Sequence, residues 1–300
     1  MNYTIGLDIG VTNLKSVCVN GDGTTLARGG VPTHSDDPAW PEHVRRRIEQ
    51  IEAEMGAPAR AVGIAAPGIA RPDGRCISWM QGRLAEVEGL DWTTFLNRCP
   101  LVPVLNDAQA ALVGEAWLGA AAGATNVVLL TLGTGIGGAA IVDGRLLRGH
   151  LGRAGHLGHI CLDPDGPPDI VRTPGSLEHF TGNYTVAPRT GGRFSSTLAL
   201  AQAHASGDAD ASRVWLRSIH VLACGLASIV NVLDPEIVIL GGGIAAAGPA
   251  LFDPLAAELE RCEWRPHDRR VRVVPAQLGE YAGAIGAARN ALLTPEGHLR

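Results

Sequence analysis

Short runs of apolar residues alternate with longer helical patterns along this chain. Apolar runs bounded by Gly, Pro or Asp predict strands over residues 3–9, 13–20, 24–28, 60–65, 101–105, 126–132, 139–142, 236–240 and 271–275. Apolar residues at helical spacing predict helices over residues 41–55, 107–118, 196–233 and 281–293, and another helix after residue 243. Residues 150–192 are rich in Gly, Pro and His, which favours loops. The pattern predicts an α/β protein.

One pattern occurs twice, at a shift of 123 residues. Segment 5–21 lies over segment 128–144, and both read as strand, Gly turn, strand, turn. Each half therefore begins with the same hairpin, as expected of a duplicated two-lobed fold, although chance similarity between two hairpins is the alternative. The small, flexible segment 119–125 predicts a lobe boundary. The predicted lobes are a small one, 1–118 plus about 281–300, and a large one, 119–280.

The first hairpin carries a group of residues suited to phosphate. Gly10 lets backbone amides approach phosphate oxygens, and Thr12 adds a hydroxyl donor. Asp8 ends a strand and can hold hydrated Mg²⁺, while Lys15 can offset phosphate charge. A structural β-turn with an incidental Asp is the alternative.

The second hairpin contains Gly133, Gly135 and Gly138 in the spacing GxGxxG. A dinucleotide-binding fold requires a helix directly after this motif, whereas residues 139–142 predict a strand. We therefore expect a second phosphate-gripping turn rather than a dinucleotide site. The sequence also lacks the GxxxxGK[ST] loop of P-loop proteins.

Two further segments could carry chemistry. Asn106 and Asp107 stand between an apolar strand and a helix, with Asp107 expected at the N-cap position. Phosphoryl transfer to a hydroxyl needs a group that accepts the proton of that hydroxyl, and the Asp107 carboxylate suits this role. Simple helix capping by Asp107 is the alternative. Gly241 to Gly243 form a strand-to-helix turn that permits close approach of a nucleoside, or is a plain turn.

Composition narrows the function classes. The 300 residues are 46% hydrophobic and 18% charged, which fits a globular protein of about two domains. The formal net charge of -5 gives no reason to expect nucleic acid. No clean apolar stretch of about 20 residues predicts a membrane span, and the N-terminus does not read as a signal peptide. The six cysteines are scattered without a CxxC pair, so we expect reduced thiols and a cytoplasmic location.

These motifs in this order resemble the ROK family of bacterial sugar kinases, within the hexokinase–actin superfamily. The matching segments are DIGVTNLK (8–15), APG (66–68), LNDAQAALVGE (105–115), LTLGTGIGGAAI (130–141), GHLGHI (155–160), GSLE (175–178) and ILGGGI (239–244). The resemblance covers almost the whole chain and implies a two-lobed actin-like, hexokinase-like (ribonuclease H-like) α/β fold. It also implies ATP-dependent phosphorylation of a hexose or amino-sugar hydroxyl, with ATP and Mg²⁺ as cofactors.

The resemblance assigns residues to each part of the site. Those around the ATP would be Asp8, Gly10, Thr12, Lys15, Thr131, Gly133, Thr134, Gly135, Gly242 and Gly243. Those around the sugar would be Gly68, Asn106, Asp107, His156, His159 and Glu178. Asp107 would be the general base, and Asp8 would hold Mg²⁺ through water. The expected partner is a small-molecule sugar, and homodimers are common among such relatives.

The chain departs from the family pattern in two places. The family has Glu-x-Gly-His where this chain has His156, and a neutral imidazole offers one acceptor and one donor instead of a carboxylate. The family's zinc cysteines align with Asp169, Val171 and Ser176. Because Val171 cannot ligate a metal, we expect no structural zinc, and we expect proline rigidity and hydrogen bonds to hold this loop instead.

Residues 77–84 replace a sugar-contacting segment of the family. Trp79 could stack on a sugar face or belong to the core, and Arg83 hints at an acidic substrate or is simply solvated. The alternative function is a regulatory pseudokinase that binds sugar or nucleotide without turnover. A DNA-binding regulator is not expected, because Asp8 lies too near the first residue for a preceding helix-turn-helix.

Overall fold

The computed structural model describes residues 2–82 and 84–293, and its chain separates into two compact units. The first unit comprises residues 1–123, 145–154 and 277–300, and the second comprises residues 124–144 and 155–276. Residues 145–154 group with the first unit, whereas the predicted lobes place them in the large lobe, 119–280. The lobe boundaries drawn from the sequence stay a prediction.

The first unit is built on a mixed five-stranded sheet of order β3-β2-β1-β4-β7. Its strands are β1 (Thr4–Ile9), β2 (Asn13–Val19), β3 (Thr25–Pro32), β4 (Ala61–Ala66) and β7 (Val104–Asn106). β1, β2 and β3 form an antiparallel meander, whereas β1, β4 and β7 run parallel. The carboxyl ends of β1 and β7 therefore lie at the same edge of the sheet. β5 (Ile69–Ala70) and β6 (Ile77–Trp79) form a separate two-stranded ribbon.

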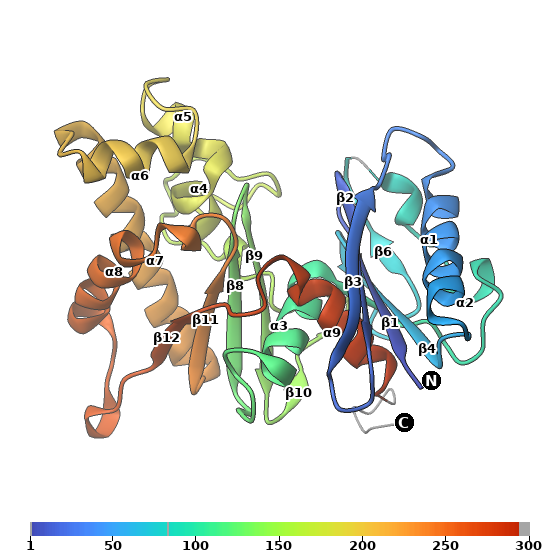
Figure 1. Cartoon of the computed structure of the whole chain (residues 1–300). Helices are drawn as coiled ribbons and strands as arrows, with labels where there is room; N and C mark the ends of the chain where they lie inside the picture. The colour runs from blue at the N-terminus through green and yellow to red at the C-terminus, as the bar shows by residue number, and fades with distance from the viewer. Residues whose placement is uncertain (1, 83, 294–300) are drawn as a thin grey trace. The chain divides into compact units, whose positions relative to one another are not determined.

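Helices cover both faces of this sheet (Figure 1). They are α1 (Trp40–Met55), η1 (Ala85–Val87), α2 (Trp92–Phe95), α3 (Asp107–Leu118), η6 (Gly279–Tyr281) and α9 (Ala282–Ala291). α1 buries Trp40, Val44, Ile48 and Ile51 at helical spacing and ends at Gly56, which has a left-handed φ of 72°. The helices predicted over 41–55 and 107–118 are confirmed.

α9 packs against both the sheet and α3 through residues without bulky side chains. A Cβ added at Gly6 of β1 would lie 1.9 Å from the carbonyl oxygen of Ala284, and one added at Gly286 would lie 1.7 Å from that of Ala110. Backbones approach this closely only where glycine leaves room. The small residues of α9 therefore bring its first turn next to the carboxyl end of β1.

The second unit repeats this plan. Four of its strands run in the order β9-β8-β11-β12, with β8–β9 antiparallel and β8, β11 and β12 parallel. They are β8 (Val127–Leu132), β9 (Ile136–Val142), β11 (Ile237–Gly241) and β12 (Arg272–Pro275), and the short β10 (Arg145–Leu146) follows β9 in the chain. β9 begins inside the glycine motif, three residues earlier than predicted for its strand. A strand rather than a helix thus follows Gly135, as expected.

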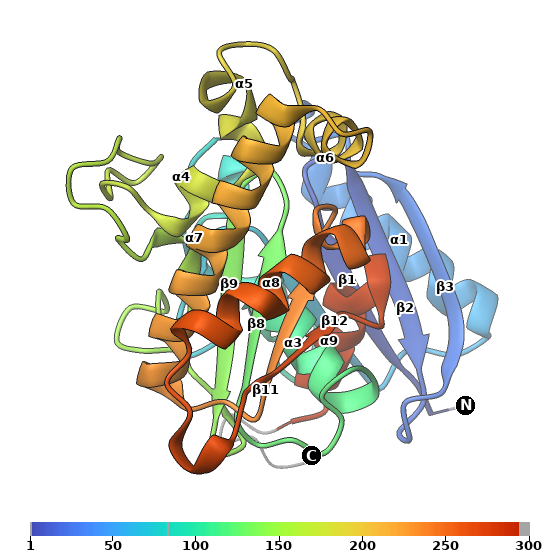
Figure 2. The ribbon, with the colours of Figure 1, turned by 90° about the vertical axis from the view of Figure 1, so that its left-hand side faces the viewer.

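Helices of the second unit include two long ones, α7 (Ala209–Leu233) and α8 (Pro249–Cys262), which lie side by side over one face of its sheet (Figure 2). The others are η2 (Leu157–His159), α4 (Leu177–Thr181), η3 (Asn183–Thr185), α5 (Val186–Arg189), α6 (Thr197–Ala205), η4 (Ala245–Ala247) and η5 (Pro266–Asp268). The helical pattern predicted over 196–233 is two helices, α6 and α7. Residues 150–192 contain short helices as well as the predicted loops.

The predicted duplication is confirmed by the strand bounds. β1 and β8 are offset by 123 residues at both ends, and so are β2 and β9. The pairing register differs by one residue, because the last pair is Ile9–Leu14 in the first hairpin and Leu132–Ile136 in the second. The second turn is thus one residue tighter than the first.

α7 is long and apolar enough by composition to cross a membrane, the one such helix among the described residues. Half of its most apolar window is buried inside the protein, and the helix packs against α4, α6 and α8. A core helix accounts for this composition, because a helix buried by neighbours is apolar on most of its faces.

Candidate functional site

The first hairpin turn lies at the carboxyl end of β1 and is braced from β3. The amide of Gly10 donates to the carbonyl of Asn13 at 3.0 Å and closes the turn. Thr33, which is buried, donates its hydroxyl to the carbonyl of Gly10 at 2.7 Å and its amide to the carbonyl of Thr12 at 3.0 Å. Thr12 itself is exposed. The turn is therefore rigid, with the Thr12 hydroxyl presented to solvent.

Asp8 is held against the first turn of α9. A Cβ added at Gly283 would lie 2.6 Å from Asp8 Oδ2, so only glycine allows this approach. Burial, followed by repulsion from Asp107, raises the pKa of Asp8 to about 7, although Lys15 opposes both effects. Lys15 pairs with Asp8 across the hairpin and forms an ion pair with Glu280 at 3.3 Å. Two carboxylates that repel each other at one sheet edge are suited to a divalent cation.

Asp107 follows β7 and is the first residue of α3. The expectation that Asp107 caps this helix is wrong, because the N-cap is Asn106, whose Oδ1 accepts the Ala108 amide at 3.0 Å. Gln109 completes a capping box with Asn106. The Asp107 carboxylate keeps contact with solvent, and its Oδ1 accepts the Ala108 amide at 2.8 Å. Poorly polar surroundings nevertheless raise the pKa of Asp107, and its hydrogen bonds offset only part of this rise.

Asn106 also links two segments of the first unit. Its Nδ2 donates to the carbonyl of Gly68 at 2.8 Å, and the Asn106 side chain is buried. Gly68 has a φ of 101°, and a Cβ there would lie 2.5 Å from the carbonyl oxygen of Trp79. Trp79 is 41% exposed, which excludes the core alternative for it. Arg83 lies outside the described residues.

The second hairpin turn is joined to Glu178. The amide of Ile136 donates to Glu178 Oε2 at 2.8 Å, and a Cβ on Gly135 would lie 2.2 Å from that oxygen. The other carboxylate oxygen, Oε1, is buried without a hydrogen-bond partner. A buried acceptor without a partner costs about 1–3 kcal/mol, and the hydroxyl of Tyr184, which is also buried without a partner, interacts with this carboxylate. Glu178 is therefore suited to accept a hydroxyl donor.

The rest of the turn is supported by the segment after α4. Asn183 and Tyr184 donate their amides to the carbonyls of Gly133 and Thr134, each at 3.0 Å. A Cβ on Gly133 would meet no atom within 4 Å. Packing therefore does not require glycine at position 133, and the open space is available to a bound group. Thr131 occupies the place in this hairpin that Asp8 has in the first.

The glycine turn after β11 lies directly against the second hairpin. Gly242 has a φ of 83°, and a Cβ there would lie 2.4 Å from the carbonyl oxygen of Leu132. Ile244 donates its amide to the same carbonyl at 3.0 Å. A Cβ on Gly243 would meet nothing within 4 Å. The structure thus brings together the two glycine turns that the sequence assigns to ATP in this unit.

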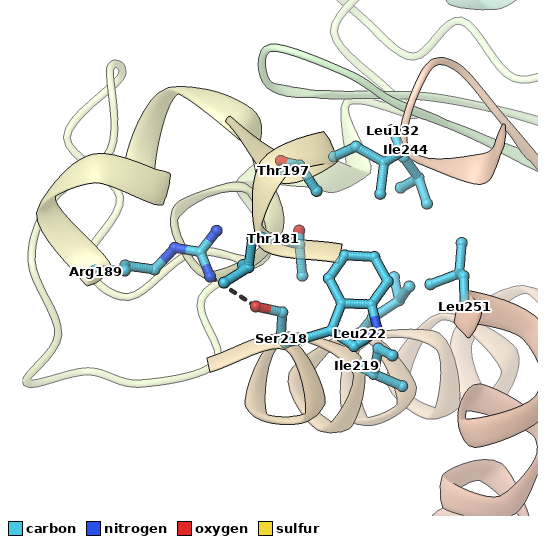
Figure 3. A pocket seen from close by; sticks show the side chains of 11 residues that line it. Leu132, Thr181, Arg189, Thr197, Ser218, Ile219, Leu222, Ile244 and Leu251 are labelled. Carbon is cyan, nitrogen blue, oxygen red and sulfur yellow. Dashed lines mark hydrogen bonds between the residues drawn. The ribbon is translucent and has the colours of Figure 1, made fainter. Parts of the chain in front are cut away.

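A small pocket lies beside these turns (Figure 3). Leu132, Ile244, Thr197 and Trp215 line it, and Arg189 points toward it and donates to Ser218 Oγ at 2.6 Å. The cavity of about 20 Å³ has room for about one water molecule. Thr197 Oγ1 is buried there without a partner and could bind that water. This pocket is too small for an adenine ring as it stands.

His156 and His159 come together around η2. Burial, and then the neighbouring His159, lower the pKa of His156, so its imidazole is neutral near pH 7. His159 Nδ1 is 2.8 Å from Asp169 Oδ2. Burial raises the pKa of Asp169, but hydrogen bonds from His159, Ser176 and the amides of Thr173 and Val171 outweigh it and lower the pKa. Because Asp169 is ionised, the neutral form of His159 donates from Nδ1 and presents Nε2 as an acceptor.

The donor set around Asp169 does not fit the family's zinc site. His159, Asp169 and Glu178 each bring one ligand atom within 4.8 Å of the others. Two ligands at about 2.0–2.1 Å from a tetrahedral ion lie roughly 3.3 Å apart, whereas His159 Nδ1 and Asp169 Oδ2 are at hydrogen-bond distance, 2.8 Å. Val171 is an exposed apolar side chain. The expectation of no structural zinc stays a prediction, and Asp169 is the hydrogen-bond acceptor that organises this loop.

The structure therefore groups the predicted residues within each unit. In the first unit, Asp8, Gly10, Thr12 and Lys15 share one hairpin, and Gly68, Asn106 and Asp107 share the adjoining strand ends. In the second, Thr131, Gly133, Thr134 and Gly135 meet Gly242, Gly243 and Glu178, and His156 adjoins His159. Sequence reasoning missed three supporting residues: Thr33, Gly283 and Tyr184. Neither Thr33 nor Gly283 belongs to a recognisable motif, so only long-range contacts reveal them.

Comparison with known proteins decides the family. The sequence pattern of the ROK family matches residues 4–293. The chain belongs to the ROK family. A glucokinase from Streptomyces coelicolor is 32% identical, over 96% of this chain and 97% of its own. An N-acetylmannosamine kinase from Escherichia fergusonii is 31% identical, over 95% of this chain and 97% of its own.

A solved ROK structure shares the fold. The ROK glucokinase from Streptomyces griseus, in complex with glucose and AMPPNP, superposes with a TM-score of 0.77 at 28% identity, over 97% of this chain and 99% of its own. The predicted fold class, a two-lobed hexokinase-like α/β fold, is confirmed. This ROK protein is a sugar kinase, and it phosphorylates a sugar.

Proposed function

We propose that this ROK kinase transfers a phosphoryl group from Mg-ATP to a hydroxyl of a hexose or an amino sugar, with Asp107 as general base. The observation that carries the proposal is the pair Asp8 and Asp107 at one edge of the first sheet. One carboxylate is partly exposed at the start of a rigid helix, and the other lies beside a phosphate-type turn. Phosphoryl transfer needs both a proton acceptor and a place for a cation.

The role of Asp107 follows from its surroundings. A carboxylate with a raised pKa is a stronger base than a free one. α3 fixes its backbone through the capping box of Asn106 and Gln109. Asn106 therefore acts mainly by positioning Asp107, because its own amide group is already bonded to Gly68 and Ala108.

The cofactor would occupy the glycine turns. Gly133 leaves room for phosphate oxygens, and Gly243 leaves room for the nucleoside, while the turn at Gly10 would contribute backbone amides. The Mg²⁺ would be held through water by Asp8, where it neutralises charge on the phosphates. The glucokinase structure with AMPPNP supports ATP as the donor.

The sugar would meet acceptors of the second unit. Glu178 Oε1 lacks a partner, and His159 Nε2 is fixed as an acceptor by Asp169. Both atoms suit hydroxyl donors of a sugar. His156, which is neutral, stands at the position where the family has a carboxylate. This replacement would change which sugar binds best. The two named relatives, which act on glucose and N-acetylmannosamine, define the sugars to test first.

The test is an ADP-release assay with Mg-ATP against glucose, mannose, glucosamine and N-acetylmannosamine. Asp107→Asn should lower kcat by about 10²–10⁴-fold, the usual contribution of a general base, while calorimetry shows nearly unchanged sugar binding. A kcat within about tenfold of the unsubstituted enzyme would reject Asp107 as base. Absence of turnover with every sugar, in a folded protein that binds ATP, would favour the regulatory alternative.

A further inference from the structure

Four side chains with metal-binding chemistry meet on α7 and α8, and none of them belongs to the site described above. α7 carries His220 and Cys224, and α8 carries Glu258 and Cys262, each pair at a spacing of four residues. Residues four apart lie on one face of a helix. The two helices pack side by side, so their pairs face each other.

The distance between two of the proposed ligands matches that of a metal centre. His220 Nε2 lies 3.8 Å from Cys224 Sγ. Nitrogen and sulfur ligands of one tetrahedral Zn²⁺, at about 2.0–2.1 Å and 2.3 Å from the ion, are about 3.6 Å apart. The Cys262 thiol interacts with that of Cys224.

The other ring nitrogen of His220 has the partner that metal-binding histidines use. His220 Nδ1 lies 2.7 Å from Glu258 Oε2, while Glu258 Oε1 pairs with Arg261 at 3.3 Å. An ionised Glu258 holds the proton on Nδ1 and leaves the Nε2 lone pair directed toward Cys224. A carboxylate behind the imidazole is the usual support of zinc-bound histidine.

We propose that His220, Cys224 and Cys262 bind a soft divalent cation of the Zn²⁺ class, with Glu258 orienting His220. The site has three protein ligands and one position for water. The ligand atoms of the three residues do not all lie within 4.8 Å of one another. Cys262 is exposed, so its thiol can turn about χ1 to complete the set. Binding deprotonates the two thiols, releases two protons to solvent and links α7 to α8. α8 follows the Gly241–Gly243 turn, so the bound ion would stabilise the support of that turn.

The experiment titrates Co²⁺ into the full chain under anaerobic, reducing conditions and then displaces it with Zn²⁺. We expect one Co²⁺ per chain with thiolate-to-metal charge-transfer absorption, and a higher melting temperature with Zn²⁺ that chelation reverses. Cys224→Ser and Cys262→Ser should each remove the charge-transfer band. Glu258→Gln should weaken binding about 10–100-fold, the usual effect of losing a support residue. Circular dichroism checks that each variant is folded.

Two control variants locate the ion. Cys99→Ser removes an exposed thiol of the first unit and should leave Co²⁺ binding unchanged. Asp169→Asn perturbs the cluster near His159 and should also leave it unchanged. Binding without thiolate absorption, binding that survives both Cys224→Ser and Cys262→Ser, or binding lost in Asp169→Asn would each overturn the proposal.

Discussion

Glu115 offers a sharp test of how the first unit is held together. This carboxylate is fully buried in α3 and accepts three backbone amides at 2.8 Å each. Oε2 binds the amide of Ala120, and Oε1 binds those of Gln277 and Leu278. These amides flank the places where the chain leaves the first unit, after residue 123, and returns to it, at residue 277. Glu115 therefore fixes both ends of the connecting segments.

The substitution Glu115→Gln keeps the shape but exchanges one oxygen for an NH₂ group. The amide oxygen can still accept from Gln277 and Leu278, so the NH₂ group must face the amide of Ala120. Two buried donors then lack partners, at about 1–3 kcal/mol each, which gives a loss of roughly 2–6 kcal/mol. At about 2–4 °C per kcal/mol for a domain of this size, the melting temperature should fall by roughly 4–24 °C.

Glu236 in the second unit is the matched control. It also accepts three hydrogen bonds, two from the amides of Thr125 and Asn126 and one from the Thr125 hydroxyl, but it is exposed and uses one oxygen for all of them. Glu236→Gln should change stability by about 0.5 kcal/mol or less. Urea and thermal unfolding measure both variants. If Glu115→Gln costs no more than Glu236→Gln, burial does not make the Glu115 bonds expensive to lose, and the reasoning is refuted.

Three further substitutions test the site. The pKa of Asp8, raised to about 7 from 3.8, makes its ionisation destabilise the fold as pH rises between these values. Asp8→Asn should therefore raise the melting temperature of the ligand-free protein near about pH 8 but not near about pH 4, and an equal effect at both would contradict the shift. His156→Glu should move the sugar ranking toward glucose, and an unchanged ranking would place His156 outside the sugar site. Asp169→Asn should reverse the hydrogen bond to His159, so that Nε2 becomes a donor and the KM for sugar rises more than kcat falls; an effect on kcat alone would contradict this.

The elements that the sequence predicts well are those with strong local patterns. The hairpins that start at Thr4 and Val127 each consist of an apolar strand, a glycine turn and a second strand. The bounds of their strands repeat at the predicted shift of 123 residues. The Gly241–Gly243 turn and the strand before it also follow from local composition. The residue at which α3 begins does not follow from the sequence, because Asn106 and Asp107 are both good N-cap residues. In the structure, the capping box with Gln109 makes Asn106 the N-cap.

The supports of the site could not be predicted in the same way. Thr33 braces Gly10 across 23 residues, and Glu178 meets Ile136 across 42. Asp169 occupies an aligned cysteine position, but the sequence does not show that its carboxylate would bond to His159 and to two loop amides. Hydrogen bonds between distant segments depend on how the segments fold together, which periodicity does not encode.

The sequence by itself thus determined the α/β class, the duplicated hairpin and the residue types available for phosphate and sugar. These features depend on nearest neighbours in the chain and on backbone freedom at glycine. Only the tertiary structure decided which charges meet and which polar atoms stay unpaired. It placed Asp8 beside Asp107, left Glu178 Oε1 without a donor, and joined His220 to Glu258, because burial and electrostatic interactions arise only when distant parts of the chain pack together.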